Sequence, residues 1–77
     1  MKKTEIIQLI LNEREKQDDK WGEQNHDMYK WLAILGEEVG EANKAVLDNK
    51  DDELIDELIQ VSAVVVAMIE SFYRNRK

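Results

Sequence analysis

The hydrophobic positions of this 77-residue chain fall into three helix-like segments separated by two polar stretches. In residues 3–16, 28–47 and 52–73, apolar residues recur every three or four positions, which is the period of an α-helix. No segment shows the strict alternation of a half-buried strand, and the chain contains no proline. The pattern predicts one all-α domain over residues 1–77, a subunit of three helices.

The two polar stretches predict how these helices are joined. Residues 17–27 contain Gly22 and no apolar stripe, which predicts a loop, with Asp27 as the N-cap of the second helix. Residues 48–51 predict a tight turn with Asn49 in the left-handed conformation. A turn this short forces the second and third helices to pack antiparallel.

The third helix is apolar around most of its circumference. Its apolar residues include Leu54, Ile55, Leu58, Ile59, Val64, Val65, Met68 and Ile69. Such a helix is buried on several sides, and a chain of this length cannot cover it alone. We therefore expect a homodimer or homotetramer, whose core is a four-helix bundle made from the second and third helices of two chains.

Charge and composition exclude several kinds of partner. The formal net charge is −6, which argues against binding to a nucleic-acid backbone. The longest apolar run is too short to span a bilayer, and no signal-peptide pattern follows the basic N-terminus. With no cysteine, disulfides and thiolate metal sites are excluded. We expect a cytoplasmic protein that binds neither nucleic acid nor membranes.

Two pairs of carboxylates give the strongest chemical signal. Glu38 and Glu41 lie in the second helix, Glu53 and Asp56 lie in the third, and each pair shares one helix face. Glu38 borders the apolar stripe, where an unpaired charge is unfavourable. Antiparallel packing would bring the pairs together, and such oxygen ligands suit Mg²⁺, Mn²⁺ or Ca²⁺. The alternative is that all four face solvent, and the helix dipole favours Glu53 there.

The same residues carry a family resemblance. The run Glu37-Glu38-Val39-Gly40-Glu41, followed by Glu53-Leu54-Ile55-Asp56, resembles the EExxE…ExxD signature of the MazG-like all-α nucleoside triphosphate pyrophosphohydrolases. This superfamily includes dimeric dUTPases, dCTP pyrophosphatases and phosphoribosyl-ATP pyrophosphohydrolases. The segment Trp21-Gly22-Glu23-Gln24-Asn25-His26 is similar to small MazG-like proteins of phages and bacteria. The resemblance covers about residues 20–70.

The resemblance implies Mg²⁺-dependent hydrolysis of an NTP or dNTP to the monophosphate and pyrophosphate, a nucleotide-pool housekeeping activity. It implies a metal site of four residues: Glu38, Glu41, Glu53 and Asp56. Glu38 and Glu41 are the candidate catalytic residues, and Glu37 or one of the ligands would accept a proton. The motif continues as Glu57 where a small or apolar residue is expected, so Glu57 either joins the metal site or faces water.

Three further residues are candidates for substrate binding: Trp21, His26 and Lys44. Trp21 could stack on a base, as its position resembles that of base-contacting aromatic residues in the family, or could anchor the loop. His26 could form a hydrogen bond to a base or phosphate, or could be a helix-cap or surface residue. Lys44 could neutralise a phosphate or pair with Glu41. The basic residues 74–77 could reach phosphates or could favour the helix C-terminus.

Two functions of another class are also compatible with the sequence. One is a non-catalytic helical dimerisation module whose acidic metal-binding face binds a basic partner. The other is a nucleotide-sensing module that binds nucleotides without hydrolysing them. Release of pyrophosphate in the presence of Mg²⁺ separates both from an enzyme.

Overall fold

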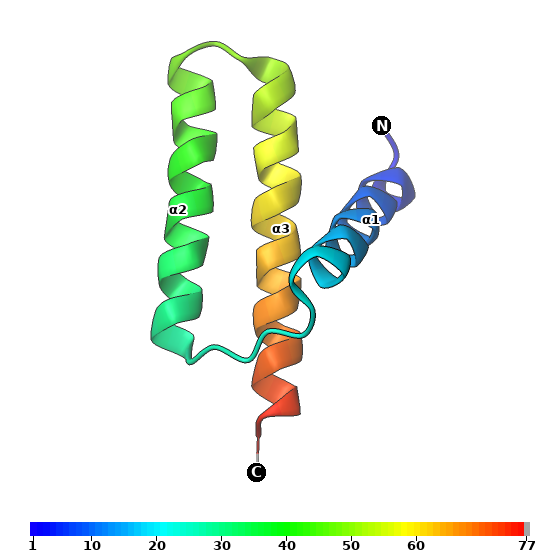
Figure 1. Ribbon diagram of the computed structural model, residues 1–77. Coiled ribbons are helices and arrows are strands. Elements are labelled where there is room, and N and C mark those ends of the chain that lie inside the picture. Colours follow the sequence, from blue (N-terminus) through cyan, green and yellow to red (C-terminus); the bar gives the residue numbers. More distant parts are fainter. Residues whose placement is uncertain (77) are drawn as a thin grey trace.

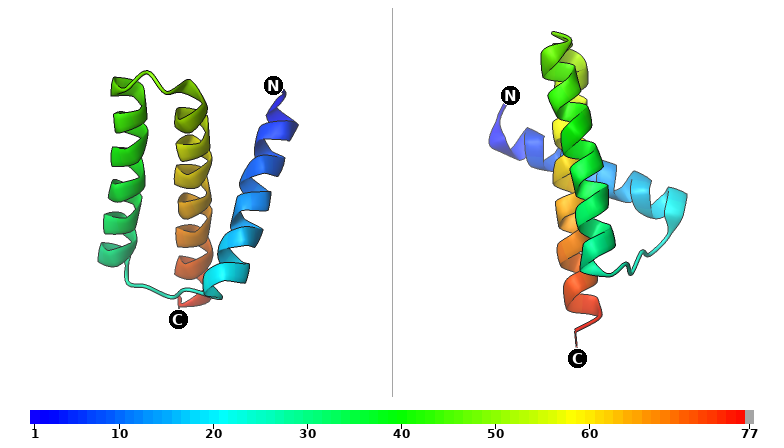
Figure 2. Two further views of the ribbon diagram at one scale, coloured as in Figure 1. Left: turned by 45° about the horizontal axis from the view of Figure 1, so that its top comes forward. Right: turned by 90° about the vertical axis from the view of Figure 1, so that its left-hand side faces the viewer.

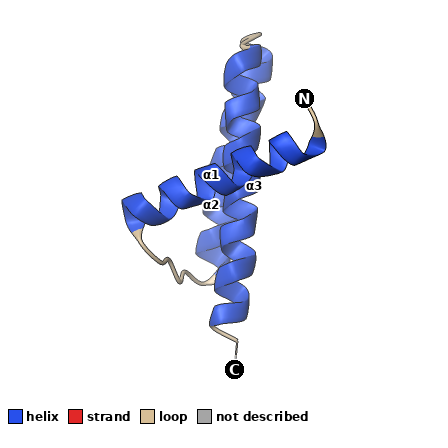
Figure 3. Cartoon of the chain, turned by 90° about the vertical axis from the view of Figure 1, so that its right-hand side faces the viewer, coloured by secondary structure: helices blue, strands red, loops and turns tan. Residues whose placement is uncertain are grey.

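The computed structural model describes residues 1–76 and contains three helices: α1 (Lys3–Trp21), α2 (Met28–Leu47) and α3 (Asp51–Arg74). The helices α2 and α3 form an antiparallel hairpin, with α1 on the other side of α3 (Figure 1). Viewed from the side, α1 crosses α3 at a steep angle (Figure 2, Figure 3). The described residues contain no strand, which confirms the all-α, three-helix prediction. None of their helices combines the length and apolar character needed to cross a membrane.

Small residues allow α2 and α3 to approach closely. The buried alanines of the hairpin are Ala42 and Ala45 on α2, and Ala63 and Ala67 on α3. Trp31 is the one large side chain in this core, only 2% exposed, and it packs against Val64 and Ala67. The core of a single chain is therefore thin, as expected for a domain of this length.

A second apolar stripe on α2 and α3 is exposed. Two sets of residues at seven-residue intervals form this outer stripe: Leu32, Val39 and Val46 on α2, and Leu58, Val65 and Phe72 on α3. Their exposed fractions lie between 38% and 56%. Seven-residue spacing keeps each set on one face of its helix. An apolar surface of this kind is typical of an interface with another protein chain.

The ends of α2 agree with the sequence prediction. The Asp27 Oδ1 atom accepts a hydrogen bond from the backbone N–H of Lys30 at 2.9 Å, so Asp27 is the N-cap. Asn49 has a φ of 57°, which confirms the left-handed residue in the turn before α3. The hairpin is therefore fixed at both ends of α2 by local chemistry.

The predicted end of the first helix is wrong. The helix continues past Lys16 to Trp21, and the connection shortens from residues 17–27 to residues 22–27. Gln17 is buried, which adds tertiary packing to a segment whose polar sequence does not show it. Gly22, with a φ of 71°, ends the helix in a conformation that glycine adopts without steric strain.

Replacing Asp27 by alanine is expected to lower the free energy of unfolding by about 1 kcal/mol, because an orphan N–H of α2 loses its acceptor. The matched variant Asp27→Asn keeps an acceptor and should remain near the wild-type value. Urea unfolding followed by circular dichroism measures both. Equal losses in the two variants would contradict the capping role.

Candidate metal centre

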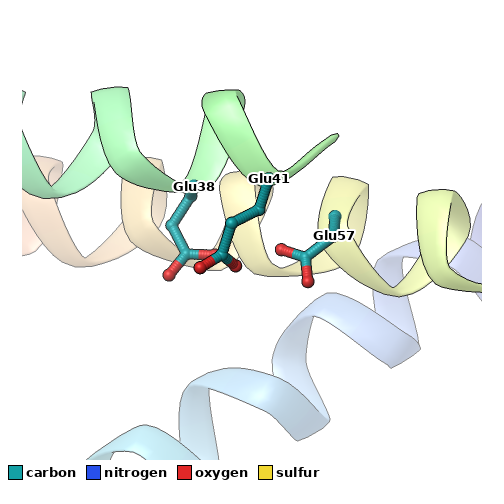
Figure 4. Close-up of side chains that lie close together, drawn as sticks. All are labelled: Glu38, Glu41 and Glu57. Atoms are coloured by element: carbon teal, nitrogen blue, oxygen red, sulfur yellow. The ribbon is translucent and has the colours of Figure 1, made fainter. Parts of the chain in front are cut away.

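Three carboxylates converge between α2 and α3. Glu38 and Glu41 lie on α2 and Glu57 on α3, and one carboxylate oxygen from each lies within 4.8 Å of the others. Figure 4 shows the three side chains extending toward a common region on the side where α1 passes. We call these three residues the acidic cluster.

The helix period explains why two of these charges lie at the edge of the core. Glu38 lies seven residues after Trp31 and seven before Ala45, and both of those residues are buried. Glu57 lies seven residues before the buried Val64. Residues seven positions apart share a helix face, so the stripe that buries apolar side chains also carries these carboxylates inward.

Burial and mutual repulsion raise the pKa values of two carboxyl groups in the cluster. Loss of solvent, followed by the nearby Glu41 carboxylate, raises the pKa of Glu57 to about 7. The pKa of Glu38 is also raised, first by loss of solvent and then by the charge of Glu41. Glu13 of α1 adds to the negative potential at Glu38. The site therefore favours a positive charge.

In the part of the chain that the structure describes, no basic side chain forms an ion pair with the acidic cluster. The ion pairs formed there involve other carboxylates, and none includes Glu38, Glu41 or Glu57. The Oε2 atom of Glu57 is buried and has no hydrogen-bond partner among the described residues. A buried carboxylate oxygen left unpaired is unfavourable, and a bound cation would satisfy it.

The structure brings together two of the four carboxylates expected as metal ligands, Glu38 and Glu41. Glu53 lies at the exposed start of α3, where its Oε1 atom is 3.8 Å from the Nζ of Lys50. Asp56 is exposed and lines a groove between α1 and α3. The ligand roles of Glu53 and Asp56 stay predictions, while the acidic cluster takes its α3 member from Glu57.

A cavity of about 230 Å³ opens beside the acidic cluster. We call it the Glu38 cavity; it is lined by Gln17, Trp21, Gln24, Trp31, Ile34, Glu38, Gln60 and Val64. Trp21 is 54% exposed at this cavity, and the Nζ of Lys20 lies 4.7 Å from the centroid of its ring. Aromatic surface combined with a few polar groups is typical of sites for small planar ligands.

The other candidate substrate contacts lie elsewhere. His26 does not line the Glu38 cavity; its ring packs edge-on against Trp31, with centroids 4.9 Å apart. Lys44 is exposed in the last turn of α2, and it forms no ion pair with a residue in the range 1–76. Glu37 is exposed beside Glu38. Roles for Trp21, His26, Lys44 and Glu37 stay predictions.

The basic end of α3 is tied to the loop that precedes α2. Arg74 donates to the Asn25 Oδ1 atom at 2.8 Å and to the backbone carbonyl of Gln24 at 3.0 Å. Its Nε atom also lies 3.3 Å from Glu23 Oε1. Arg74 is thus held by the protein, and Lys77, the last residue of the predicted basic tail, lies outside the described residues.

The helical hairpin and the acidic cluster define an all-α protein with a candidate divalent-metal centre built from carboxylates. The chain belongs to the phosphoribosyl-ATP pyrophosphohydrolase family (PRA-PH), whose pattern matches residues 4–72. This family is part of the MazG-like all-α NTP pyrophosphohydrolase superfamily, and its activity is that of a hydrolase acting on acid anhydrides. No curated protein and no solved structure shows a significant match to the chain.

Proposed function

We propose that this protein is a Mg²⁺-dependent nucleoside triphosphate pyrophosphohydrolase, which converts an NTP or dNTP to the monophosphate and pyrophosphate. The observation that carries the proposal is the convergence of Glu38, Glu41 and Glu57, which form no ion pair with a basic side chain of residues 1–76, in a chain whose family hydrolyses acid anhydrides. The description of that family makes phosphoribosyl-ATP the second candidate substrate.

The donor set of the acidic cluster fits a hard divalent cation. Carboxylate oxygens are the ligands that Mg²⁺ and Mn²⁺ prefer, and the buried Glu57 Oε2 atom has no hydrogen-bond partner within residues 1–76. A bound Mg²⁺ would neutralise phosphate charge and lower the pKa of a coordinated water. Glu38, Glu41 and Glu57 would hold the ion, with Glu53 and Asp56 as the alternative ligands from α3.

The residues around the cluster would position the nucleotide. A base stacked on Trp21 in the Glu38 cavity would direct its phosphates toward the carboxylates, because Glu38 belongs to both. Proton acceptance from the attacking water falls to Glu37 or to a carboxylate of the cluster.

A panel of NTPs and dNTPs, together with phosphoribosyl-ATP, tests the proposal in the presence of Mg²⁺ or Mn²⁺. We expect pyrophosphate release from at least one triphosphate and its loss on addition of EDTA. Thermal stabilisation by a nucleotide without product would instead favour a nucleotide-sensing module. Absence of both turnover and stabilisation would favour the helical dimerisation module.

We further propose that the protein forms at least a homodimer through the outer stripe, which would complete a four-helix bundle. Replacing Val39 by glutamate is expected to convert the assembly to monomers, because a charge would be buried in an apolar interface. The control Ala33→Glu places the same charge at an exposed position of α2 outside the outer stripe, about 120° around the helix from Val39. Sedimentation equilibrium measures both, and a monomeric wild-type protein would contradict the proposal.

A further inference from the structure

We propose that the Glu38 cavity selects a nucleobase carrying a keto oxygen, and that the side-chain amide of Gln17 makes the selecting hydrogen bond. The inference rests on the proposed function, because it names the substrate class of the same site. Hypoxanthine and uracil carry an oxygen where adenine and cytosine carry an amino group. One fixed donor or acceptor in the cavity therefore separates the two classes.

Gln17 is held in a single orientation. Its side chain lies on α1 and the residue is only 8% exposed. The Oε1 atom accepts a hydrogen bond from Arg14 Nη1 at 3.0 Å. Because a guanidinium offers only donors, the oxygen end of the amide must face Arg14. Within residues 1–76 the Nε2 end makes no hydrogen bond, so it is a donor without a partner.

Arg14 cannot easily turn away to let this amide flip. Its Nε and Nη2 atoms donate to Glu70 Oε1 at 3.0 and 2.8 Å. The Nη2 atom also donates to Asp18 Oδ1 at 3.0 Å. Charge-assisted bonds to two carboxylates fix the plane of the guanidinium. Glu70 on α3 therefore orients Arg14, and Arg14 in turn orients the side-chain amide of Gln17.

The free end of the amide faces the Glu38 cavity. Arg14 lines a different cavity, on the side of Glu70 and Arg74, whereas Gln17 lines the Glu38 cavity. The oxygen and nitrogen of a planar amide diverge, so an oxygen turned toward Arg14 directs Nε2 to the other side. A fixed N–H donor pairs with a keto oxygen and leaves an exocyclic amino group, itself a donor, without a partner.

The size of the cavity and two of its other residues fit a base. The volume of about 230 Å³ is below the roughly 300–1,000 Å³ of pockets that enclose a whole drug-sized ligand, which suits a base alone. Trp31 lines the cavity, and its Nε1–H is a buried donor that has no hydrogen-bond partner among residues 1–76. Gln60 also lines it, with an amide that no hydrogen bond to a described residue orients.

Two matched substrate pairs test the proposal: ITP against ATP, and UTP against CTP. In each pair the bases differ by oxygen against amino at one position. We expect kcat/KM to be about tenfold or more higher for the keto member, since an unpaired buried donor lowers binding by this order. The variant Gln17→Glu keeps an oxygen for Arg14 and exchanges the donor for an acceptor, so the keto-to-amino ratio should fall about tenfold or reverse.

The control is Gln8→Glu, the same substitution on the same helix. Gln8 is exposed, and its side chain bonds to Asn12, away from the Glu38 cavity. The keto-to-amino ratio of kcat/KM for Gln8→Glu should therefore equal that of the wild type. The use of ratios removes any general effect of the added charge near Glu38. Gln17→Met, which deletes the donor without adding charge, should bring the ratio toward one. Unchanged ratios in both Gln17 variants would overturn the proposal.

A binding measurement separates this inference from the proposed function. Trp21 and Trp31 both line the cavity, so quenching of their fluorescence reports a bound nucleoside without metal or hydrolysis. Tighter binding of inosine than of adenosine, lost in Gln17→Glu, supports the keto preference even if no triphosphate is hydrolysed. Equal affinity for the two nucleosides overturns it even if hydrolysis is found.

Discussion

Replacing Glu57 by glutamine is expected to reduce kcat/KM for triphosphate hydrolysis by about 100-fold or more. A metal centre supplies several kcal/mol of charge stabilisation in the transition state, and the substitution removes the single α3 carboxylate of the acidic cluster. The same substitution should raise the melting temperature of the metal-free protein. It removes a carboxylate whose ionisation is opposed by burial and by Glu41.

The matched controls are Glu53→Gln and Asp56→Asn, the other carboxylates of the first two turns of α3 that are candidate ligands. Both are exposed and outside the cluster, so we expect each to change kcat/KM and the melting temperature much less than Glu57→Gln. Isothermal titration with Mg²⁺ and a pyrophosphate assay measure binding and turnover. If Glu53→Gln or Asp56→Asn removes activity while Glu57→Gln does not, the ligand set follows the sequence motif and the cluster is not the metal centre.

The fold follows from short-range signals, which explains what the sequence predicts well. The start of α2 depends on Asp27 and the turn before α3 on Asn49, and both act within a few residues of their own position. The end of α1 depends on tertiary packing: Arg14 bonds to Glu70 of α3, and Gln17 is buried. No local pattern in a polar segment records a contact made 56 residues away in the chain.

The sequence alone also does not identify which carboxylate of α3 joins the acidic cluster. The spacing of Glu53 and Asp56 matches the family signature, but Asp56 is rotated by about 100° from Glu57 around the helix axis. Glu57 and Gln60 repeat the i, i+3 spacing and share the stripe of the buried residues Val64 and Ala67. That stripe is visible in the sequence. The choice of Glu57 becomes clear once the side of α3 that faces α2 is known.

The metal-free protein is expected to lose stability as pH rises from about 4.5 to about 7. The ordinary carboxyl pKa of 4.5 applies to Glu57 in the unfolded chain, and the fold raises it to about 7. Between these values the folded state binds more protons than the unfolded state, so the free energy of unfolding decreases with pH. The contribution of Glu57 to the free energy of unfolding is fully present below about pH 4.5. It is lost once Glu57 ionises in the folded protein.

The variant Glu57→Gln isolates this contribution. The variant lacks the carboxyl group whose pKa is raised, so the stability of the wild type relative to the variant should fall across this range and level off above about pH 7. Urea unfolding at a series of pH values in EDTA measures it. Parallel curves for the two proteins would show that Glu57 ionises normally.

Excess Mg²⁺ should abolish this dependence of wild-type stability on pH between about 4.5 and about 7. A cation at the cluster binds the ionised carboxylate, so the ion and the proton compete for Glu57. Mg²⁺ affinity is then expected to rise about tenfold per pH unit up to about 7, while one proton is displaced per ion. In excess Mg²⁺ the stability gained from binding therefore grows over the pH range in which the metal-free protein weakens. A wild-type Mg²⁺ affinity that does not change between pH 5 and 7 would place the metal away from Glu57.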